Sequence, residues 1–136
     1  MNAILSIASS GMSAAMRRLE VSASNVANAL SDGPLPSADA NVRAKYPAPY
    51  APKRVDQVET VGGGTAAVVS DVSPSIVQTY DPSAPFADSS GMVASPNVDF
   101  ANEAVQQIIA RYTFAMNAMV ERTYDRMMKS LLDIKT

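Results

Sequence analysis

The sequence contains no histidine, no cysteine and no tryptophan among its 136 residues. Without histidine or cysteine it cannot form a Ser-His-Asp triad or a cysteine nucleophile, and it lacks the usual ligands of zinc, haem iron and iron–sulfur clusters. The absence of cysteine also excludes disulfides. We therefore expect no cofactor, no metal site and no small-molecule substrate, and we predict that the protein is not an enzyme.

Long hydrophobic runs are absent as well, because no unbroken apolar stretch exceeds four residues. Such short runs predict no transmembrane span. The first residues lack the basic and continuously apolar regions of a cleavable secretory signal, which leaves a cytoplasmic protein or one exported without cleavage. A net charge of −2 and an isoelectric point near 4.9 argue against a protein that binds nucleic acid.

Proline is confined to the middle of the chain. All nine prolines lie between Pro34 and Pro96, and seven of the eight methionines lie outside that stretch. Because proline breaks helices, the chain divides into residues 1–32, 33–97 and 98–136. We predict a mainly α fold, in which two long terminal helices pair as a coiled-coil inner domain and a Pro-rich loop and β-hairpin lie between them.

The first segment reads as one helix over residues 1–30. Its larger side chains recur with steps of four and three, the heptad spacing of a coiled coil, and only Ser9 in this set is polar. The set comprises Leu5, Ser9, Met12, Met16, Leu19, Ala23, Val26 and Leu30. A second stripe of mostly small residues runs beside it, made of Ile4, Ala8, Gly11, Ala15, Ser22 and Ala29.

This segment carries little charge, since only Arg17, Arg18 and Glu20 are ionised along a helix about 45 Å long. A solitary amphipathic helix would have a wider polar face. The pattern indicates burial on several sides, which a chain of this size hardly provides by itself. A core helix in an ordinary bundle remains the alternative.

The last segment predicts a second helix over residues 98–136, with Asp99 as its N-cap and Glu103 in its first turn. It carries a matching apolar stripe: Val105, Ile109, Tyr112, Met116, Met119, Thr123, Met127, Leu131 and Ile134. The two helices could pair in either direction. Methionine is unbranched and repacks easily, so the methionines of both stripes indicate an adaptable interface.

The middle segment has two parts. Residues 34–52 hold five prolines, so we expect no helix there but an extended loop that lies on a neighbour or is disordered in the free subunit. Residues 53–61 and 65–72 flank three glycines and predict a β-hairpin, to which residues 76–80 could add a third strand.

Two weaker motifs in the middle segment have ordinary explanations. The glycines at 62–64 are followed by no Lys-Ser/Thr pair and no helix, so a hairpin turn is favoured over a phosphate loop. Asp81, Asp88 and Asp99 could be proposed as paired carboxylates, but their spacing is more typical of turn and cap residues.

Two blocks of sequence resemble bacterial flagellar axial proteins, the family of rod, hook and hook-associated subunits. The first reads ASSGM over residues 8–12 and RLEVSASNVANA over residues 18–29, although the family's usual Thr-containing stretch after it is replaced by residues 30–33. The second reads YDPSAPFADSSGMVASPNVD over residues 80–99 and is similar to proximal-rod members, with Met92 in place of the usual tyrosine. Arg111 and Asn117 resemble a third family block with altered spacing.

The resemblance implies a structural subunit of the proximal rod, in which the two terminal helices stack into a helical tube that transmits torque. It implies as partners further copies of the chain, other rod proteins, the membrane-embedded ring with its rod adaptor, and the flagellar type III export apparatus. It places the protein in the periplasmic rod of the basal body, exported without a cleaved signal peptide. The alternative function is a soluble coiled-coil adaptor or secretion chaperone that binds a partner helix.

Two sets of residues are expected to carry this function. We predict that Asn25 and Asn28 cap or bridge the end of the first helix, and that the heptad residues contact one another in the same or neighbouring subunits. The subunit-packing residues are Leu5, Met12, Met16, Leu19, Val26, Val105, Ile109, Tyr112, Met116, Met119, Met127 and Leu131. The family-motif residues are Asn25, Asn28, Pro96, Asn97, Arg111 and Asn117.

Overall fold

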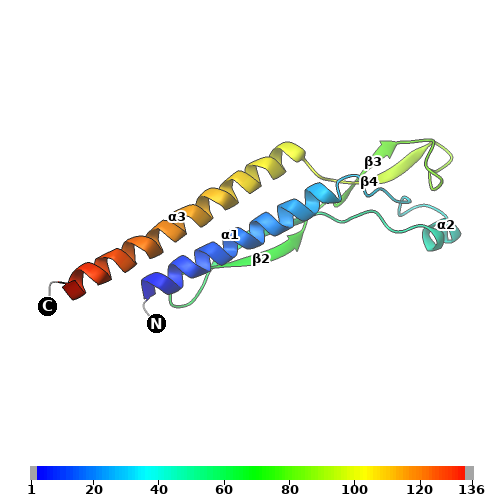
Figure 1. The fold of residues 1–136 in the computed structure, drawn as a ribbon. Coiled ribbons are helices and arrows are strands. Elements are labelled where there is room, and N and C mark those ends of the chain that lie inside the picture. Colours follow the sequence, from blue (N-terminus) through cyan, green and yellow to red (C-terminus); the bar gives the residue numbers. More distant parts are fainter. Residues whose placement is uncertain (1–2, 134–136) are drawn as a thin grey trace.

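Two long antiparallel helices dominate the computed structural model, which describes residues 3–133 (Figure 1). Helix α1 spans Ala3–Ala27 and helix α3 spans Phe100–Asp133, and the start of α1 and the end of α3 lie at the same end of the molecule. The prediction of a helix-rich fold with a long helix in each terminal segment is confirmed. Position Ile134 of the predicted stripe lies outside the described residues.

The helix ends follow the local chemistry of the sequence. Asp99 caps α3, because its Oδ1 accepts hydrogen bonds from the backbone N–H groups of Ala101 at 2.9 Å and Asn102 at 3.2 Å. Helix α1 ends three residues earlier than predicted. The chain turns there with the backbone N–H of Ser31 donating to the carbonyl of Asn28 at 3.0 Å.

The predicted hairpin is present as strands β1, Lys53–Glu59, and β2, Thr65–Asp71. They pair antiparallel with Val55 opposite Val69. Gly62, Gly63 and Gly64 all have positive φ, between 87° and 97°, a conformation that glycine adopts without strain. The three glycines therefore form a turn between two strands, as expected.

The hairpin lies along α1 on the side away from α3, so that α1 is the central element of the molecule (Figure 1). At the tip, Ser10 Oγ accepts a hydrogen bond from the Thr65 backbone N–H at 3.1 Å. The same hydroxyl donates to the carbonyl of Ile7 at 2.7 Å. These bonds fix the tip of the hairpin against the first turns of α1.

The idea of a third strand in the hairpin is wrong. Residues Ile76–Tyr80 do form a strand, β3, but it pairs antiparallel with β4, Met92–Pro96, in a separate two-stranded sheet. The second edge of β4 is bridged by Gly33, which exchanges two backbone hydrogen bonds of 2.9 and 3.0 Å with Ala94. Strand β4 was missed because it ends in Ser-Pro, which is more typical of a turn, and because Gly33, its partner on the second edge, is distant in sequence.

The expectation that residues 34–52 contain no helix is also corrected. Helix α2 spans Ala40–Lys45, in the proline-free stretch between Pro36 and Pro47. Asp39 caps it by accepting a hydrogen bond from the Asn41 N–H at 2.8 Å. The rest of the segment is irregular, and it lies at the end of the molecule opposite the start of α1 and the end of α3 (Figure 1).

Large side chains contribute little to the interior. The buried apolar residues are mainly alanines, with Leu35 and Val93 as the larger members. The accessible surface is 9070 Å². A compact monomer of this mass would expose about 6,800 Å². The chain therefore leaves far more surface exposed than a self-contained domain of its size.

Among residues 3–133, no helix combines the length and the hydropathy that crossing a membrane requires.

Candidate assembly surface

The contact between α1 and α3 is made by small and polar residues. Ala8, Gly11, Ala15 and Ser22 of α1 are buried, and Ala110 is the buried residue of α3. A Cβ on Gly11 would lie 2.6 Å from Asn117 Oδ1, which shows how closely the two helices approach at that point. The stripe of small residues in the first segment was therefore the signal for the intramolecular contact.

Polar bonds reinforce the same contact towards the start of α3. Arg18 Nη1 donates to Gln106 Oε1 at 2.6 Å, and Ser22 Oγ donates to the carbonyl oxygen of Glu103 at 3.1 Å. These bonds set the register of the two helices. Residues such as Gln106 could not be found from an apolar periodicity.

The larger heptad residues do not form this contact, and a coiled-coil pairing of the two stripes within one chain is not confirmed. Met116, Met119 and Tyr112 are 65%, 67% and 65% exposed. The other predicted packing residues that are exposed are Met16, Val26, Val105, Ile109, Met127 and Leu131. Leu5, Met12 and Leu19 are half-buried. The predicted stripes thus lie largely on the outside of the helix pair.

Two apolar grooves result from this arrangement. The first, of about 630 Å³, lies between the helices and is lined by Met16 and Leu19 from α1 and by Ile108, Tyr112 and Phe114 from α3, among others. It brings part of both predicted stripes together. Both helices thus contribute large apolar side chains to a single exposed surface.

The second groove, of about 480 Å³, is formed almost wholly by α3. Helix α3 is about 51 Å long and α1 about 38 Å, and α3 continues past the start of α1 (Figure 1). Its lining runs from Met116 to Leu131 on α3 and includes Ile4 of α1. The last turns of α3 therefore expose their apolar residues.

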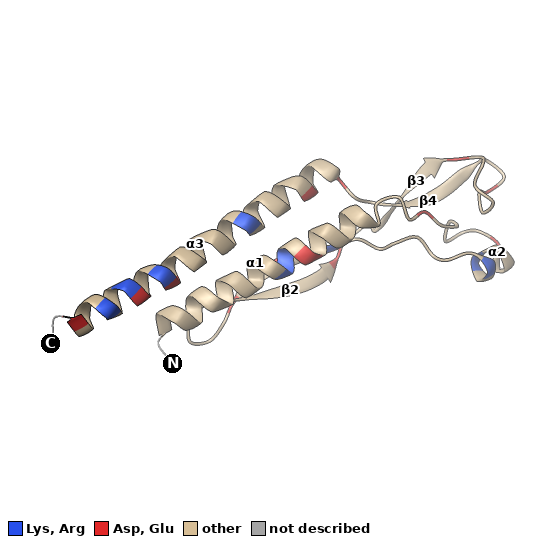
Figure 2. Cartoon of the chain, in the orientation of Figure 1, with Lys and Arg blue, Asp and Glu red and all other residues tan. Residues whose placement is uncertain are grey.

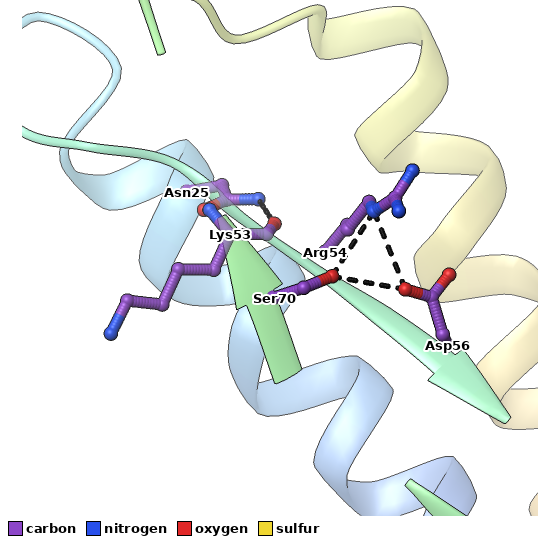
Figure 3. Close-up of polar contacts among 5 residues, drawn as sticks. All are labelled: Asn25, Lys53, Arg54, Asp56 and Ser70. Carbon is purple, nitrogen blue, oxygen red and sulfur yellow. Dashed lines mark hydrogen bonds and ion pairs between the residues drawn. The ribbon is translucent and has the colours of Figure 1, made fainter. Parts of the chain in front are cut away.

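Asn25 joins three elements at the other end of the helix pair. Its side chain is 1% exposed and makes four hydrogen bonds. Nδ2 donates to the carbonyl of Lys53 and to Glu103 Oε1, each at 2.7 Å. Oδ1 accepts from the Lys53 N–H and the Tyr50 hydroxyl, each at 3.0 Å. The amide thus bridges α1 to β1 and α3, and Figure 3 shows the paired contact with Lys53.

The other family-motif residues lie at several places. Asn28 Nδ2 donates to the carbonyl of Ser24 at 2.9 Å and so bonds within the end of α1. Asn97 Nδ2 donates to the carbonyl of Pro74 at 2.9 Å, next to the buried Pro96. Arg111 is exposed at the first groove. The structure therefore assigns local bonding roles to the asparagines, while Arg111 borders the exposed surface.

A polar network joins the two strands of the hairpin near the start of α3. Arg54 Nε is 3.4 Å from Asp56 Oδ2 and donates to Ser70 Oγ at 3.1 Å, and Ser70 Oγ donates to Asp56 Oδ2 at 2.9 Å (Figure 3). Cross-strand contacts of this kind stabilise a two-stranded pair by modest amounts. This surface is polar, in contrast with the apolar face of the helices.

Asp81 and Asp88, which were considered as possible catalytic carboxylates, accept hydrogen bonds within tight turns of the chain. Asp81 Oδ1 accepts from the backbone N–H of Ser83 at 3.0 Å and from its hydroxyl at 2.6 Å. The Ser83 hydroxyl is the main cause that lowers the pKa of Asp81 below its ordinary value of 3.8. Asp88 Oδ1 accepts from the N–H groups of Ser90 and Met92. Within residues 3–133 no group of three or more acidic residues is placed to hold a metal ion.

Charge is distributed unevenly over the two helices. The first half of α1 carries no charged side chain, whereas acidic and basic residues are interspersed along the second half of α3 (Figure 2). The apolar residues of α3 share these turns with Arg122, Arg126 and Lys129. The exposed face of α3 is therefore an apolar stripe bordered by charges of both signs.

Comparison with known proteins agrees with this architecture. Residues 5–33 match the family model described as flagella basal body rod protein, and residues 89–134 match the one described as flagellar basal body rod FlgEFG protein C-terminal. The first match covers most of α1, and the second covers β4 and α3. The two matched segments thus include both helices of the pair.

Full-length relatives extend the match across the whole chain. The flagellar basal-body rod protein FlgC of Yersinia enterocolitica is 36% identical over 138 residues, covering 96% of this chain and 95% of its own. FlgC of Salmonella typhimurium is 34% identical with the same coverage, and FlgC of Agrobacterium fabrum is 31% identical over 98% of this chain and 94% of its own. The chain therefore belongs to the FlgC family of flagellar basal-body rod proteins.

Proposed function

We propose that this chain is a structural subunit of the proximal rod in the flagellar basal body. It assembles helically with copies of itself and with other rod proteins, and the resulting shaft transmits torque for motility. The observation that carries the proposal is the exposed apolar face of the helix pair, because such a face needs further subunits to cover it.

The exposed apolar face contains the two grooves described above, and these could each bind a helix of a neighbouring subunit. Each groove is lined by large apolar side chains from at least one long helix. Long apolar grooves accept the apolar stripe of another helix. A contact between different surfaces of successive copies does not close on itself, so repetition gives an open helical assembly.

The predicted packing residues keep their proposed role in this assembly. Met12, Met16 and Leu19 lie along α1, and Tyr112, Met116 and Met119 lie along α3. Burying a side chain of this size contributes about 1.5–3 kcal/mol. Several such residues per contact supply the stability that the small interior of one chain does not.

The finer assignments rest on the family resemblance. We propose the membrane-embedded ring, its rod adaptor and the type III export apparatus as further partners, and the periplasmic rod as the location. Export without a cleaved signal peptide belongs to the same proposal. The helices would then complete their packing only on assembly, which couples stability to the presence of neighbours.

Single cysteines test the proposed interface directly, because the chain has no cysteine of its own. Met119→Cys and Leu131→Cys place one thiol each on the exposed face of α3, and Gln57→Cys places one at an exposed residue of β1 as a control. A single thiol can crosslink only between molecules. We expect a short bismaleimide to crosslink the two helix variants in isolated basal bodies more than Gln57→Cys; equal crosslinking in all three would contradict the proposal.

The adaptor or chaperone alternative is not favoured by the relatives and predicts a different behaviour. It requires a stable small oligomer in dilute solution, whereas a rod subunit should have weakly protected terminal helices as a monomer. Circular dichroism with hydrogen exchange on the purified chain separates the two. Strong protection of α1 and α3 in a small, stable oligomer would support the adaptor.

A further inference from the structure

Four of the eight methionines line a single groove of the molecule. Met116, Met119, Met127 and Met128 all border the groove of about 480 Å³ on α3. They are 65%, 67%, 61% and 41% exposed. Their side chains lie on a face of α3 to which α1 contributes only Ile4.

The thioether is also the main target for two-electron oxidants in this chain, because cysteine, histidine and tryptophan are absent. We propose that this groove is an oxidation site of the free subunit, whose substrates are hydrogen peroxide and related two-electron oxidants. The sulfur attacks one peroxide oxygen, the O–O bond breaks, and an S–O bond forms. The sulfur loses two electrons, the peroxide gains them, and the second oxygen leaves as water.

The consequence of this oxidation rests on the proposed function. A sulfoxide is polar and accepts strong hydrogen bonds, so it disrupts a methionine-rich interface. If a neighbouring subunit covers the groove, oxidation of the free chain hinders docking, while docking shields the methionines from the oxidant. Oxidation of the groove would then prevent a free subunit from docking, whereas subunits that are already assembled would be protected from oxidation.

An internal reference is available in the same chain. Met92 lies in β4 and is half-buried, away from the helix groove. Exposure of the thioether increases its oxidation, so Met92 should react more slowly than the groove methionines.

The first experiment measures the site alone. The purified full chain is treated with dilute hydrogen peroxide, and the rate of sulfoxide formation at each methionine is followed by peptide mass spectrometry. We expect each of Met116, Met119 and Met127 to react at least about threefold faster than Met92. Equal rates, or a faster reaction at Met92, would overturn the oxidation site.

The second experiment measures the consequence. All four groove methionines are replaced by glutamine, whose polar amide imitates a sulfoxide, or by leucine, which keeps the volume and remains apolar. Each variant, and the unaltered chain as reference, is expressed in a flagellated bacterium made non-motile by deletion of its own copy of the rod subunit. We expect the leucine variant to restore swimming and the glutamine variant to reduce the swimming radius at least about threefold, because several polar groups would be buried at the interface.

The outcomes separate this proposal from the proposed function. Full swimming by the glutamine variant, or equal loss in both variants, would overturn the proposed effect of oxidation on docking, because polarity would then not be the cause. Circular dichroism of both variants checks that the exposed substitutions leave the helices intact. If Met119→Cys does not crosslink, the proposed interface is contradicted. The oxidation rates in the free chain test the oxidation site separately, because they do not depend on assembly.

Discussion

The side chain of Asn117 lies directly against Gly11, so that a Cβ on Gly11 would come within 2.6 Å of its Oδ1. Asn117 is held there by a hydrogen bond of 2.8 Å from its Nδ2 to the carbonyl of Thr113. The absence of a side chain at residue 11 thus allows α1 and α3 to approach closely at a polar residue. Both residues belong to the blocks that resemble the family.

The substitution Gly11→Ala tests this contact. Alanine favours a helix by about 1 kcal/mol over glycine, but here its methyl group displaces Asn117 from its bond with Thr113. In an Asn117→Ala background the displacement is absent and the helix propensity of alanine acts alone. We expect the double-mutant cycle to show a coupling of at least about 1 kcal/mol in the free energy of unfolding. Thermal melting followed at 222 nm, with an osmolyte if required, measures it; simple additivity would contradict the contact.

Replacing Asn25 should destabilise the fold more than any other single polar change in α1. Asn25→Ala leaves the backbone groups of Lys53 and the side chain of Glu103 without their partner, at a cost of about 2–4 kcal/mol. Asn28→Ala is the matched control, since that amide makes an exposed bond to Ser24 and should cost less than about 1 kcal/mol. Chemical unfolding of both variants gives the comparison, and similar values for the two would refute a special role for Asn25.

Asn25→Asp predicts a pH dependence with a definite sign. The new carboxyl group is buried next to Glu103 and has lost the two N–H donors of the amide. Burial and the neighbouring carboxylate would raise its pKa above the ordinary value of about 3.9. The variant should therefore be destabilised near neutral pH and recover as the pH falls through the raised pKa. Unfolding curves between neutral and acidic pH test this, and an unchanged difference from the wild type at all pH values would count against it.

The hairpin tip offers a matched pair of glycines. Gly62 and Gly64 have φ values of 94° and 97°, so alanine is similarly strained at both. A Cβ at residue 62 meets nothing within 4 Å, whereas a Cβ at residue 64 would lie 2.5 Å from Ser10 Oγ. Gly64→Ala should therefore cost at least about 1 kcal/mol more than Gly62→Ala, because it also disturbs the bond between Ser10 and Thr65. Melting curves of the two variants measure this difference in stability. Equal losses of stability in the two variants would show that the tip of the hairpin does not pack on α1.

Asp81 provides a prediction at an exposed turn. The hydrogen bond from the Ser83 hydroxyl, followed by that from the Ser83 N–H, holds the pKa of Asp81 below its ordinary value. The hydrogen bonds to the carboxylate therefore stabilise the turn at pH values above the ordinary pKa of an aspartate. This stability is lost as the pH falls through the lowered pKa of Asp81. Ser83→Ala should raise the pKa of Asp81, while Ser37→Ala in another loop should not. Carboxyl-carbon NMR titration measures both, and an unshifted Asp81 in the Ser83 variant would contradict the assignment.

Local sequence signals located most of the secondary structure. Residue types with strong backbone preferences marked the N-cap at Asp99 and the glycine turn of the hairpin, and the period of apolar residues marked both helices. Strand β4 and helix α2 were not predicted, because β4 ends in Ser-Pro and is bridged on one edge by the distant Gly33, and because α2 is short and flanked by prolines. Signals within a few residues cannot report such pairings.

The sequence by itself determined that the chain has two long apolar helices, a hairpin between them, no thiol or imidazole chemistry, and the blocks of a flagellar rod protein. Only the tertiary structure decided which face of each helix meets the other. Two stripes with the same spacing run along α1, and periodicity does not say which one packs inside. The stripe of small residues is the one that packs against α3, because Gly11 and Ala15 allow the helices to approach closely and the hydrogen bonds of Ser22 and Asn25 fix the register. The larger residues are consequently left exposed, at the surface where we propose that neighbouring subunits bind.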